Sequence, residues 1–309
     1  MSYFYGPVPS RRLGFSLGVD LLPKKVCSFD CLYCQLGGTE KKIMKRFSFV
    51  NLNKLTAEIK PIIKAYPNID YITIAGSGEP TLHKDLDKII SRLKKVTQNK
   101  YPVCVITNSS LLYRKDVRKE LLLADLIIPS LDAVTEETFR KINRPHEKVG
   151  LDKILDGLFK LKKEFYGEIW LEIMLMEGFN CNIKEANKFK KIIKELKPDK
   201  VQLNIPMRPS GLNIVIPDVD KVQKIKRLIL EGSEIVSEFK KKKEPGYKFC
   251  LKKGSILRFL KVRPGTVSDL SGALNIVPKD VIKQLNLLID EQSVKESVRG
   301  KNKYFVSND

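Results

Sequence analysis

Three cysteines stand close together near the start of the chain and could bind metal. Cys27, Cys31 and Cys34 form a C-x₃-C-x₂-C pattern. Thiolates are the usual ligands of iron–sulfur clusters, and a [4Fe–4S] cluster normally takes four of them. Three thiolates in one loop would leave the fourth iron without a protein ligand, and an open metal site can bind a cofactor or substrate. A zinc loop or incidental buried cysteines are the alternatives, although zinc prefers paired C-x₂-C knuckles with four ligands.

The aromatic residue before the last of these cysteines adds a resemblance to a known family. With Tyr33 the pattern reads C-x₃-C-x-aromatic-C, which resembles the motif of the radical S-adenosylmethionine (SAM) superfamily. The resemblance implies that Cys27, Cys31 and Cys34 are catalytic and hold a [4Fe–4S] cluster. It also implies that the open iron chelates SAM, and that one electron cleaves SAM to a 5′-deoxyadenosyl radical. A flavodoxin-like or ferredoxin-like reductant would supply that electron.

Further residues are expected to contact SAM. The stretch Gly76-Ser77-Gly78-Glu79-Pro80 resembles the family's "GGE" motif, in which Gly78 lets the backbone approach SAM and Glu79 offers a carboxylate near its amino group. Tyr33 is expected to contact the cofactor as well. Polar residues at the ends of later predicted strands would bond the ribose or the carboxylate, or else act as helix caps and turns: Asn108, Ser130, Asp132 and Asn204.

The elements that must position these residues alternate between strands and helices. Apolar runs predict strands at Phe15–Leu22, Tyr71–Ala75, Val103–Thr107, Leu126–Leu131, Ile169–Met176 and Val201–Ile205. Amphipathic stretches predict helices at Leu55–Tyr66, Leu86–Val96, Arg114–Ala124, Leu151–Phe165, Ile183–Leu196 and Val219–Leu230. Strand–helix alternation favours a parallel α/β sheet. Six such units predict an incomplete (β/α)₆ barrel, with the chemistry at the carboxyl ends of its strands.

The composition changes after Glu238, which divides the chain into a partial barrel at 1–238 and a basic linker with a small domain at 239–309. In the second part, helices are expected at Ser255–Val262, at Val267–Leu274 and from Pro278 to about Glu291, followed by a hairpin at Lys295–Val306. This order is typical of a winged helix-turn-helix. Such a domain would grip nucleic acid, or else mediate protein contacts or cover the open barrel. Its expected recognition helix and wing carry the polar residues Lys279, Lys283, Gln284, Asn286, Lys295, Arg299, Lys301 and Lys303.

The overall charge indicates a polyanionic partner. The 309 residues carry a formal net charge of +21, and 42% of them are hydrophobic, enough for a substantial core. RNA or DNA is the first candidate and a membrane surface the second, while lysine-rich composition without a purpose is the alternative. No apolar run is long enough to span a bilayer, and Met1 to Arg12 lack a signal-peptide core, so a cytoplasmic protein is expected.

The chain's opening segment narrows the expected substrate. Gly6–Gly14 and the Tyr33-Cys34-Gln35 junction resemble the branch of the superfamily that groups with the wyosine-forming tRNA enzymes. Those enzymes bind a second cluster through earlier cysteines, and no cysteine precedes Cys27, so wyosine chemistry itself is not expected. The leading hypothesis is RNA modification, with tRNA as substrate. A small-molecule or protein substrate and a non-catalytic iron–sulfur DNA-binding regulator are the alternatives.

Several other residues have reactive or charged side chains, but the sequence shows no clear partner for them. Arg11 and Arg12 could clamp a phosphate or carboxylate, or form a surface ion pair. His83 and His146 could donate a proton or contact substrate, but a role in loop structure is expected. The isolated cysteines could assemble a second cluster, but they are expected to be core residues: Cys104, Cys181 and Cys250.

Overall fold

A single eight-stranded sheet forms the centre of the protein. The computed structural model describes residues 2–210, 212, 214–236, 254–274, 276–300 and 302–308. Its strands follow one another in chain order, with β1 antiparallel to β2 and every later pair parallel. They are β1 (Phe4–Ser10), β2 (Gly14–Val19), β3 (Tyr71–Ile74), β4 (Val103–Thr107), β5 (Leu126–Pro129), β6 (Glu168–Met174), β7 (Lys200–Asn204) and β8 (Glu234–Ile235). The six predicted strands are confirmed as β2 to β7.

Strand β1 was not predicted, and its sequence explains why. Pro7 and Pro9 lack an amide hydrogen, which argues against a central strand but is tolerated at a sheet edge. β1 occupies the edge of the sheet and pairs only with β2. The pairing is irregular between Tyr5 and Val8, as is common at edges.

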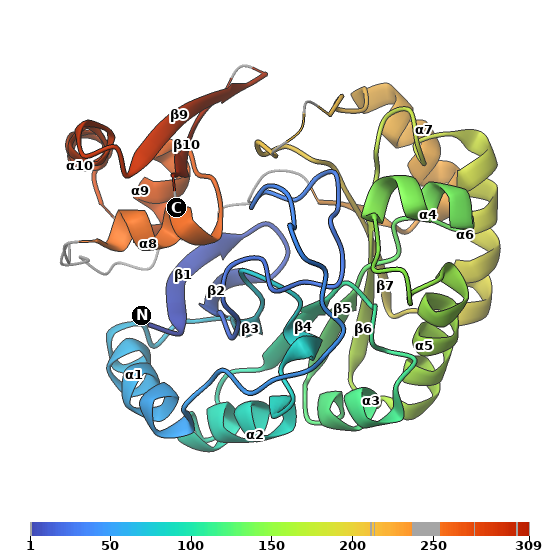
Figure 1. Ribbon diagram of the computed structural model, residues 1–309, viewed down its shortest axis with the longest axis horizontal. Helices are drawn as coiled ribbons and strands as arrows, with labels where there is room; N and C mark the ends of the chain where they lie inside the picture. Colours follow the sequence, from blue (N-terminus) through green and yellow to red (C-terminus); the bar gives the residue numbers. More distant parts are fainter. Residues whose placement is uncertain are drawn as a thin grey trace.

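Helices cover the outer face of the sheet (Figure 1). They are α1 (Leu52–Ala65), the short helix η1 (Pro80–Leu82), α2 (Leu86–Val96), α3 (Lys115–Leu121), α4 (Glu136–Asn143), α5 (Leu151–Glu164), α6 (Ile183–Leu196) and α7 (Val219–Ile229). Alternate strand residues such as Ile72 and Leu171 pack with the buried faces of these helices in one large core. This arrangement confirms the predicted incomplete (β/α)₆ barrel.

The inner face of the sheet is partly apolar and partly polar. Cys104, Ile128 and Trp170 form a separate small core there. Glu172 and Asn204 alternate with residues of the outer core, so their side chains also lie on the inner face. Arg12, in the turn between β1 and β2, forms an ion pair with Glu172 on β6. This contact shows that the sheet curls far enough for its first strands to meet its last ones.

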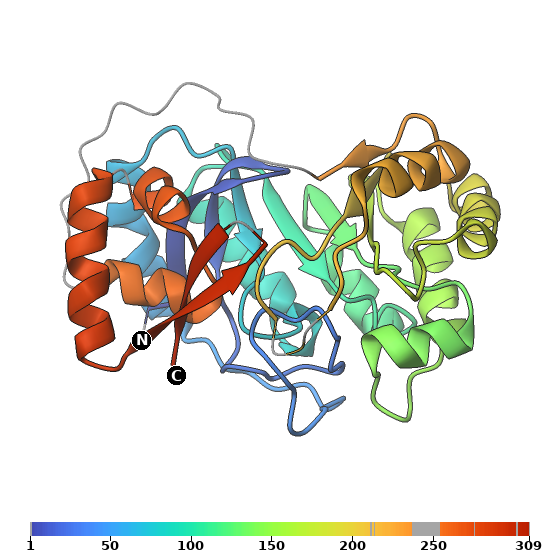
Figure 2. The same cartoon turned by 90° about the horizontal axis from the view of Figure 1, so that it is seen from above.

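The C-terminal part is a compact unit of three helices and a hairpin. Its elements are α8 (Ser255–Val262), α9 (Val267–Leu274), α10 (Pro278–Asp290), β9 (Val294–Arg299) and β10 (Asn302–Ser307), which confirms the predicted elements. Its core includes Val8 of β1, so the unit packs against the edge strand, as Figures 1 and 2 show.

Some sequence predictions fall beyond the described residues. The expected domain boundary at 238/239, the basic linker, Cys250 and Lys301 lie outside them. Among the helices that are described, none combines the length and the apolar character that crossing a membrane requires.

Candidate active site

The loop that carries the three cysteines follows β2 and is fixed on one side by the end of β3. The Lys25 amide donates to the Ser77 carbonyl at 2.7 Å, and the Glu79 amide donates to the Val26 carbonyl at 3.0 Å. A Cβ atom on Gly78 would lie 2.1 Å from the Val26 carbonyl oxygen. Only glycine allows the strand end to approach the loop this closely, so Gly78 has a steric role at this position.

The end of α4 holds the other side of the loop. The amides of Asp30 and Leu32 donate to the carbonyls of Asn143 and Ile142 at 3.1 and 2.9 Å. Within the same loop, the Phe29 ring packs edge-to-face on a ring of α4, with centroids 5.5 Å apart. The loop has little regular secondary structure of its own, so these contacts determine where its sulfur atoms lie.

Each cysteine sulfur has a hydrogen-bond donor from a different part of the chain. The Asn108 amide nitrogen Nδ2 lies 3.6 Å from Cys27 Sγ, and Asn143 Nδ2 lies 3.5 Å from Cys31 Sγ. The third donor is the Lys25 ammonium, whose Nζ lies 3.2 Å from Cys34 Sγ. Donors of this kind stabilise negative charge on sulfur, and hydrogen bonds to sulfur tune iron–sulfur clusters. The donor set therefore fits a cluster bound through three thiolates.

Two of the three thiols must lose protons before a cluster can bind. Burial raises the pKa of Cys27 to about 12 and that of Cys31 well above its ordinary value. These thiols must therefore release protons when metal binds. Among the described residues, no three His, Cys, Asp or Glu side chains converge closely enough to hold a single ion. A cluster does not require such convergence, because each thiolate binds a different iron.

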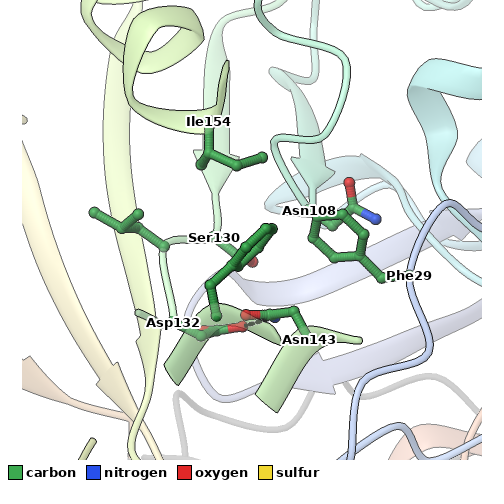
Figure 3. A pocket seen from close by; sticks show the side chains of 8 residues that line it. Phe29, Asn108, Ser130, Asp132, Asn143 and Ile154 are labelled. Carbon is green, nitrogen blue, oxygen red and sulfur yellow. Dashed lines mark hydrogen bonds between the residues drawn. The ribbon is translucent and has the colours of Figure 1, made fainter. Parts of the chain in front are cut away.

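Tyr33 and Asp132 form a buried network beside Cys31. The Tyr33 hydroxyl donates to Asp132 Oδ2 at 2.5 Å, and Asn143 Nδ2 donates to the same oxygen at 2.7 Å. The Met174 amide donates to the other carboxylate oxygen at 2.9 Å. Asp132 therefore orients Asn143 toward Cys31. Figure 3 shows the hydrogen bond between Asp132 and Asn143. Burial raises the pKa of Asp132, and the hydrogen bonds from Tyr33, Met174 and Asn143 oppose that change.

The Glu79 carboxylate is occupied by donors from its own chain. Its Oε1 accepts from the Thr81 amide and from the hydroxyls of Thr81 and Thr107 at 3.1, 2.6 and 2.6 Å. Its Oε2 accepts from the Asn108 amide at 2.7 Å. Burial raises the pKa of Glu79, while these bonds lower it. Glu79 thus joins the end of β3 to the end of β4 and fixes the residue that faces Cys27.

Ser130 and Asn204 occupy different places around the site. Ser130 lines a small cavity together with Asn108 and Asp132, shown in Figure 3. Its volume is about 10 Å³, room for one water molecule and not for SAM. Asn204 lies apart from this group. Its amide oxygen accepts from Arg11 at 3.4 Å, and its nitrogen donates to Glu172 at 3.3 Å.

Two residues beside the sulfurs were not identified from the sequence. Asn143 is the last residue of α4, and Arg144 after it has a left-handed backbone. In the sequence, Asn143 is therefore typical of a helix end. Lys25 reads as an ordinary surface lysine next to the motif. Their contacts arise from tertiary structure, which residue spacing does not encode.

The remaining candidates have structural roles. Cys104 and Cys181 are buried in apolar clusters, as predicted. His83 is buried, and its ring nitrogens lie 3.0 and 3.1 Å from the amides of Phe49 and Asp85. These contacts join the segment after the cysteine loop to η1, which agrees with the predicted loop role of His83.

A comparison with protein families decides the classification. The family model of the Radical SAM superfamily matches residues 21–189, from the cysteine loop into α6. The chain belongs to the radical SAM superfamily. It is therefore an enzyme whose cofactors are a [4Fe–4S] cluster and SAM.

Individual relatives show how far the similarity extends. A UPF0026 protein of Methanocaldococcus jannaschii is 38% identical over 242 residues, which cover 78% of this chain and 74% of that protein. A protein of Brachyspira hyodysenteriae named GTPase Obg is 37% identical over 297 residues. That match covers 95% of this chain but only 43% of the relative, so this chain spans less than half of that protein.

Solved radical SAM structures share the fold. A radical SAM methyltransferase from Sphaerobacter thermophilus has a TM-score of 0.57 at 14% identity, covering 71% of this chain and 64% of that one. The enzyme anSMEcpe with bound AdoMet has a TM-score of 0.51 at 16% identity, with the same two coverages. At these identities the likeness shows the fold alone.

Replacing Glu79 with glutamine should destabilise the protein. In Glu79→Gln an amide N–H group replaces a carboxylate oxygen that accepts hydrogen bonds, so a donor would point at a donor. An unsatisfied buried donor costs about 1–3 kcal/mol. Urea unfolding of the metal-free protein measures this loss. Glu137→Gln, at an exposed surface ion pair on α4, is the control and should change stability by less than about 0.5 kcal/mol. Equal effects of the two variants would contradict the role of Glu79.

Folding stability should fall in mild acid because of His83. Burial lowers the pKa of His83 to about 4, while the Asp85 carboxylate raises it. The unfolded chain therefore binds more protons than the folded one between about pH 6.5 and 4, so stability decreases as the pH falls through this range. At pH 5 the loss is about 2 kcal/mol relative to pH 7.

The measurement is the urea midpoint of wild type and His83→Asn at both pH values. The variant should lose that part of the pH dependence. His146→Asn, which replaces the other histidine of the sequence, is the control and should keep the wild-type dependence. If the stability of His83→Asn depended on pH as the wild type does, the assignment of this pH dependence to His83 would be wrong.

Proposed function

We propose that the protein is a radical SAM enzyme that modifies RNA, with tRNA as the expected class, and that Cys27, Cys31 and Cys34 hold its cluster. The observation that carries the cluster assignment is the arrangement of the three sulfurs. Each has its own donor, and the loop that carries them lies at the carboxyl ends of parallel strands. In such barrels the carboxyl ends of the strands carry the chemistry. The cluster, once reduced by a flavodoxin-like or ferredoxin-like protein, supplies the electron that cleaves SAM.

The proposed SAM contacts divide into binding and positioning residues. Asn108, Ser130 and Asn204 have polar side chains at the strand ends and would bind SAM. Gly78 would act indirectly, by letting the end of β3 approach the cysteine loop at Val26. Three further residues are bonded mainly to their own chain and would position these groups: Tyr33, Glu79 and Asp132.

The RNA proposal is supported by charge and by the C-terminal unit. The net charge of +21 favours a polyanion. Three helices followed by a hairpin match the order of a winged helix, which we assign to residues 239–309, leaving the partial barrel at 1–238. Lys279, Lys283 and Asn286 are exposed on α10, and Gln284 is half-buried there. The wyosine-branch resemblance of Gly6–Gly14 adds to the expectation of tRNA.

The β9–β10 hairpin offers fewer basic side chains for RNA binding than the sequence suggested. Lys303 pairs with Glu296 at 2.8 Å, and Arg299 donates to the Ile214 carbonyl at 3.1 Å. Arg299 is therefore turned toward the barrel, and Lys303 is already paired. We accordingly place the RNA contact on α10, with Lys295 beside it.

A free nucleotide is the second candidate substrate. A protein of Saccharolobus islandicus named Probable GTP 3′,8-cyclase is 28% identical over 221 residues, which cover 70% of this chain and 65% of that protein. Its name refers to a nucleotide substrate, which shares phosphate chemistry with RNA.

Addition of tRNA should stimulate SAM cleavage by the reconstituted, dithionite-reduced enzyme. The measurement is 5′-deoxyadenosine formation against tRNA concentration at several salt concentrations. The double variant Lys279→Gln/Lys283→Gln should require more tRNA, and its log–log salt slope should fall by about two, because two phosphate contacts are lost.

The matched control removes two exposed lysines from α6, on the opposite side of the molecule in Figure 1. Lys190→Gln/Lys191→Gln should behave as wild type. Cleavage that tRNA never stimulates would contradict the RNA proposal. Absence of 5′-deoxyadenosine under all conditions would contradict the radical SAM assignment of the three cysteines.

A further inference from the structure

Four arginines from distant parts of the chain meet where the C-terminal unit faces the inner side of the sheet. We call them the arginine cluster: Arg11, Arg12, Arg208 and Arg263. The first two lie in the turn between β1 and β2, the third follows β7, and the fourth follows α8. Arg11 donates to the amide oxygen of Asn204 and to the Val236 carbonyl, both at 3.4 Å. The cluster thus spans the opening between the first and last strands.

The positive charge of the cluster is only half neutralised. Arg12 pairs with Glu172, and Arg208 lies 3.8 Å from Asp269. Within the described residues, neither Arg11 nor Arg263 forms an ion pair. Four guanidinium groups therefore share two carboxylates in a region where several of their atoms are inaccessible to water.

Several guanidinium donors are buried without a partner. In the described part of the chain, Nε of Arg208 and both Nε and Nη2 of Arg263 are shielded from solvent and donate no hydrogen bond. The Arg263 guanidinium lies over the Phe259 ring, with Cζ 4.6 Å from the ring centroid, so packing holds it in place. An unsatisfied buried donor is costly, and this cost is removed when an acceptor binds.

The guanidinium groups also repel one another. Burial, together with the charges of Arg208 and Arg11, lowers the pKa of Arg263 to about 9. Burial and the charge of Arg208 lower the pKa of Arg11 to about 10. A bound anion would relieve this repulsion, which gives the cluster a preference for negatively charged ligands.

A basic groove is lined by residues that are close in the chain to two of these arginines. Its volume is about 310 Å³, and it lies between the cysteine loop at Gln35–Gly37 and the hairpin. Pro209 and Leu260, close in the chain to Arg208 and Arg263, line it together with Lys24 and Lys295. A ligand in this groove would lie between the cysteine loop and the hairpin, next to the chain segments that carry Arg208 and Arg263.

We propose that the arginine cluster binds a phosphate group of the substrate and so orients that substrate toward the cysteine loop. Guanidinium groups present planar pairs of donors that match phosphate oxygens, and several of them together neutralise a multiply charged anion. This inference rests on the proposed function, because it assigns part of the substrate of the same site. The phosphate belongs either to RNA or to a free nucleotide, and the experiment separates these sources.

The test measures binding of inorganic pyrophosphate to the anaerobic holoenzyme by calorimetry. Wild type should bind pyrophosphate at one site. Arg263→Gln should bind at least about tenfold more weakly, because hydrogen bonds to charged groups are worth about 1.5–3 kcal/mol. Arg258→Gln is the matched control, since it removes the same charge from the exposed face of α8, and it should bind as wild type does.

Competition with bound pyrophosphate identifies the source of the phosphate. Displacement by tRNA but not by GTP assigns the site to RNA, and displacement by GTP alone assigns it to a free nucleotide. Failure of both to compete would overturn the inference. So would equal pyrophosphate affinity in wild type and Arg263→Gln, or a loss confined to SAM affinity, which would assign the cluster to SAM.

A second measurement does not depend on the stability of a variant. Pyrophosphate should slow phenylglyoxal modification of the arginine cluster in the wild-type holoenzyme while leaving Arg258 unprotected, as read by mass spectrometry. Absence of selective protection would overturn the inference even if Arg263→Gln failed to fold. Wild-type 5′-deoxyadenosine formation, measured in parallel, reports separately on the proposed function.

Discussion

The site depends on how an irregular loop is held against the ends of a sheet. The loop with Cys27, Cys31 and Cys34 has little regular secondary structure, so contacts with the rest of the protein fix its position. The close approach of Gly78 to Val26 and the amide contacts with α4 fix its two sides. Because parallel strands all end at the same edge of the sheet, donors from β4 and α4 reach two of the sulfurs. The barrel thus supplies the loop with a rigid frame.

The buried carboxylates of the site bond mainly to other parts of the chain. Glu79 joins two strand ends, and Asp132 orients Asn143, so both place the groups that contact sulfur. The arginine cluster differs, because its donors outnumber the acceptors that the described chain offers. Satisfied polar groups mark positions that the fold itself needs. In the arginine cluster the unsatisfied donors belong to neighbouring groups of the same charge, which is why we propose a ligand there.

Much of this architecture could be predicted from sequence, and the exceptions have physical causes. Strands β2 to β7 have continuous apolar runs and most helices have clear periodicity, so these were predicted correctly. The short helices α4 and η1 were not predicted. Strand β1 contains Pro7 and Pro9, and β8 has only two residues, so neither gives a strand signal. Cysteine spacing is local and was informative. The roles of Asn143 and Arg263 depend on contacts between distant segments, which no local pattern reveals.

The central claim is that three thiolates leave one iron open to SAM. The most direct measurement is electron paramagnetic resonance of the anaerobically reconstituted, dithionite-reduced protein, with and without SAM. The account predicts about four irons per chain, a reduced-cluster signal that shifts when SAM is added, and loss of that signal when any one of the three cysteines is replaced by alanine. Zinc in place of iron, or a cluster signal that SAM leaves unchanged, would contradict it.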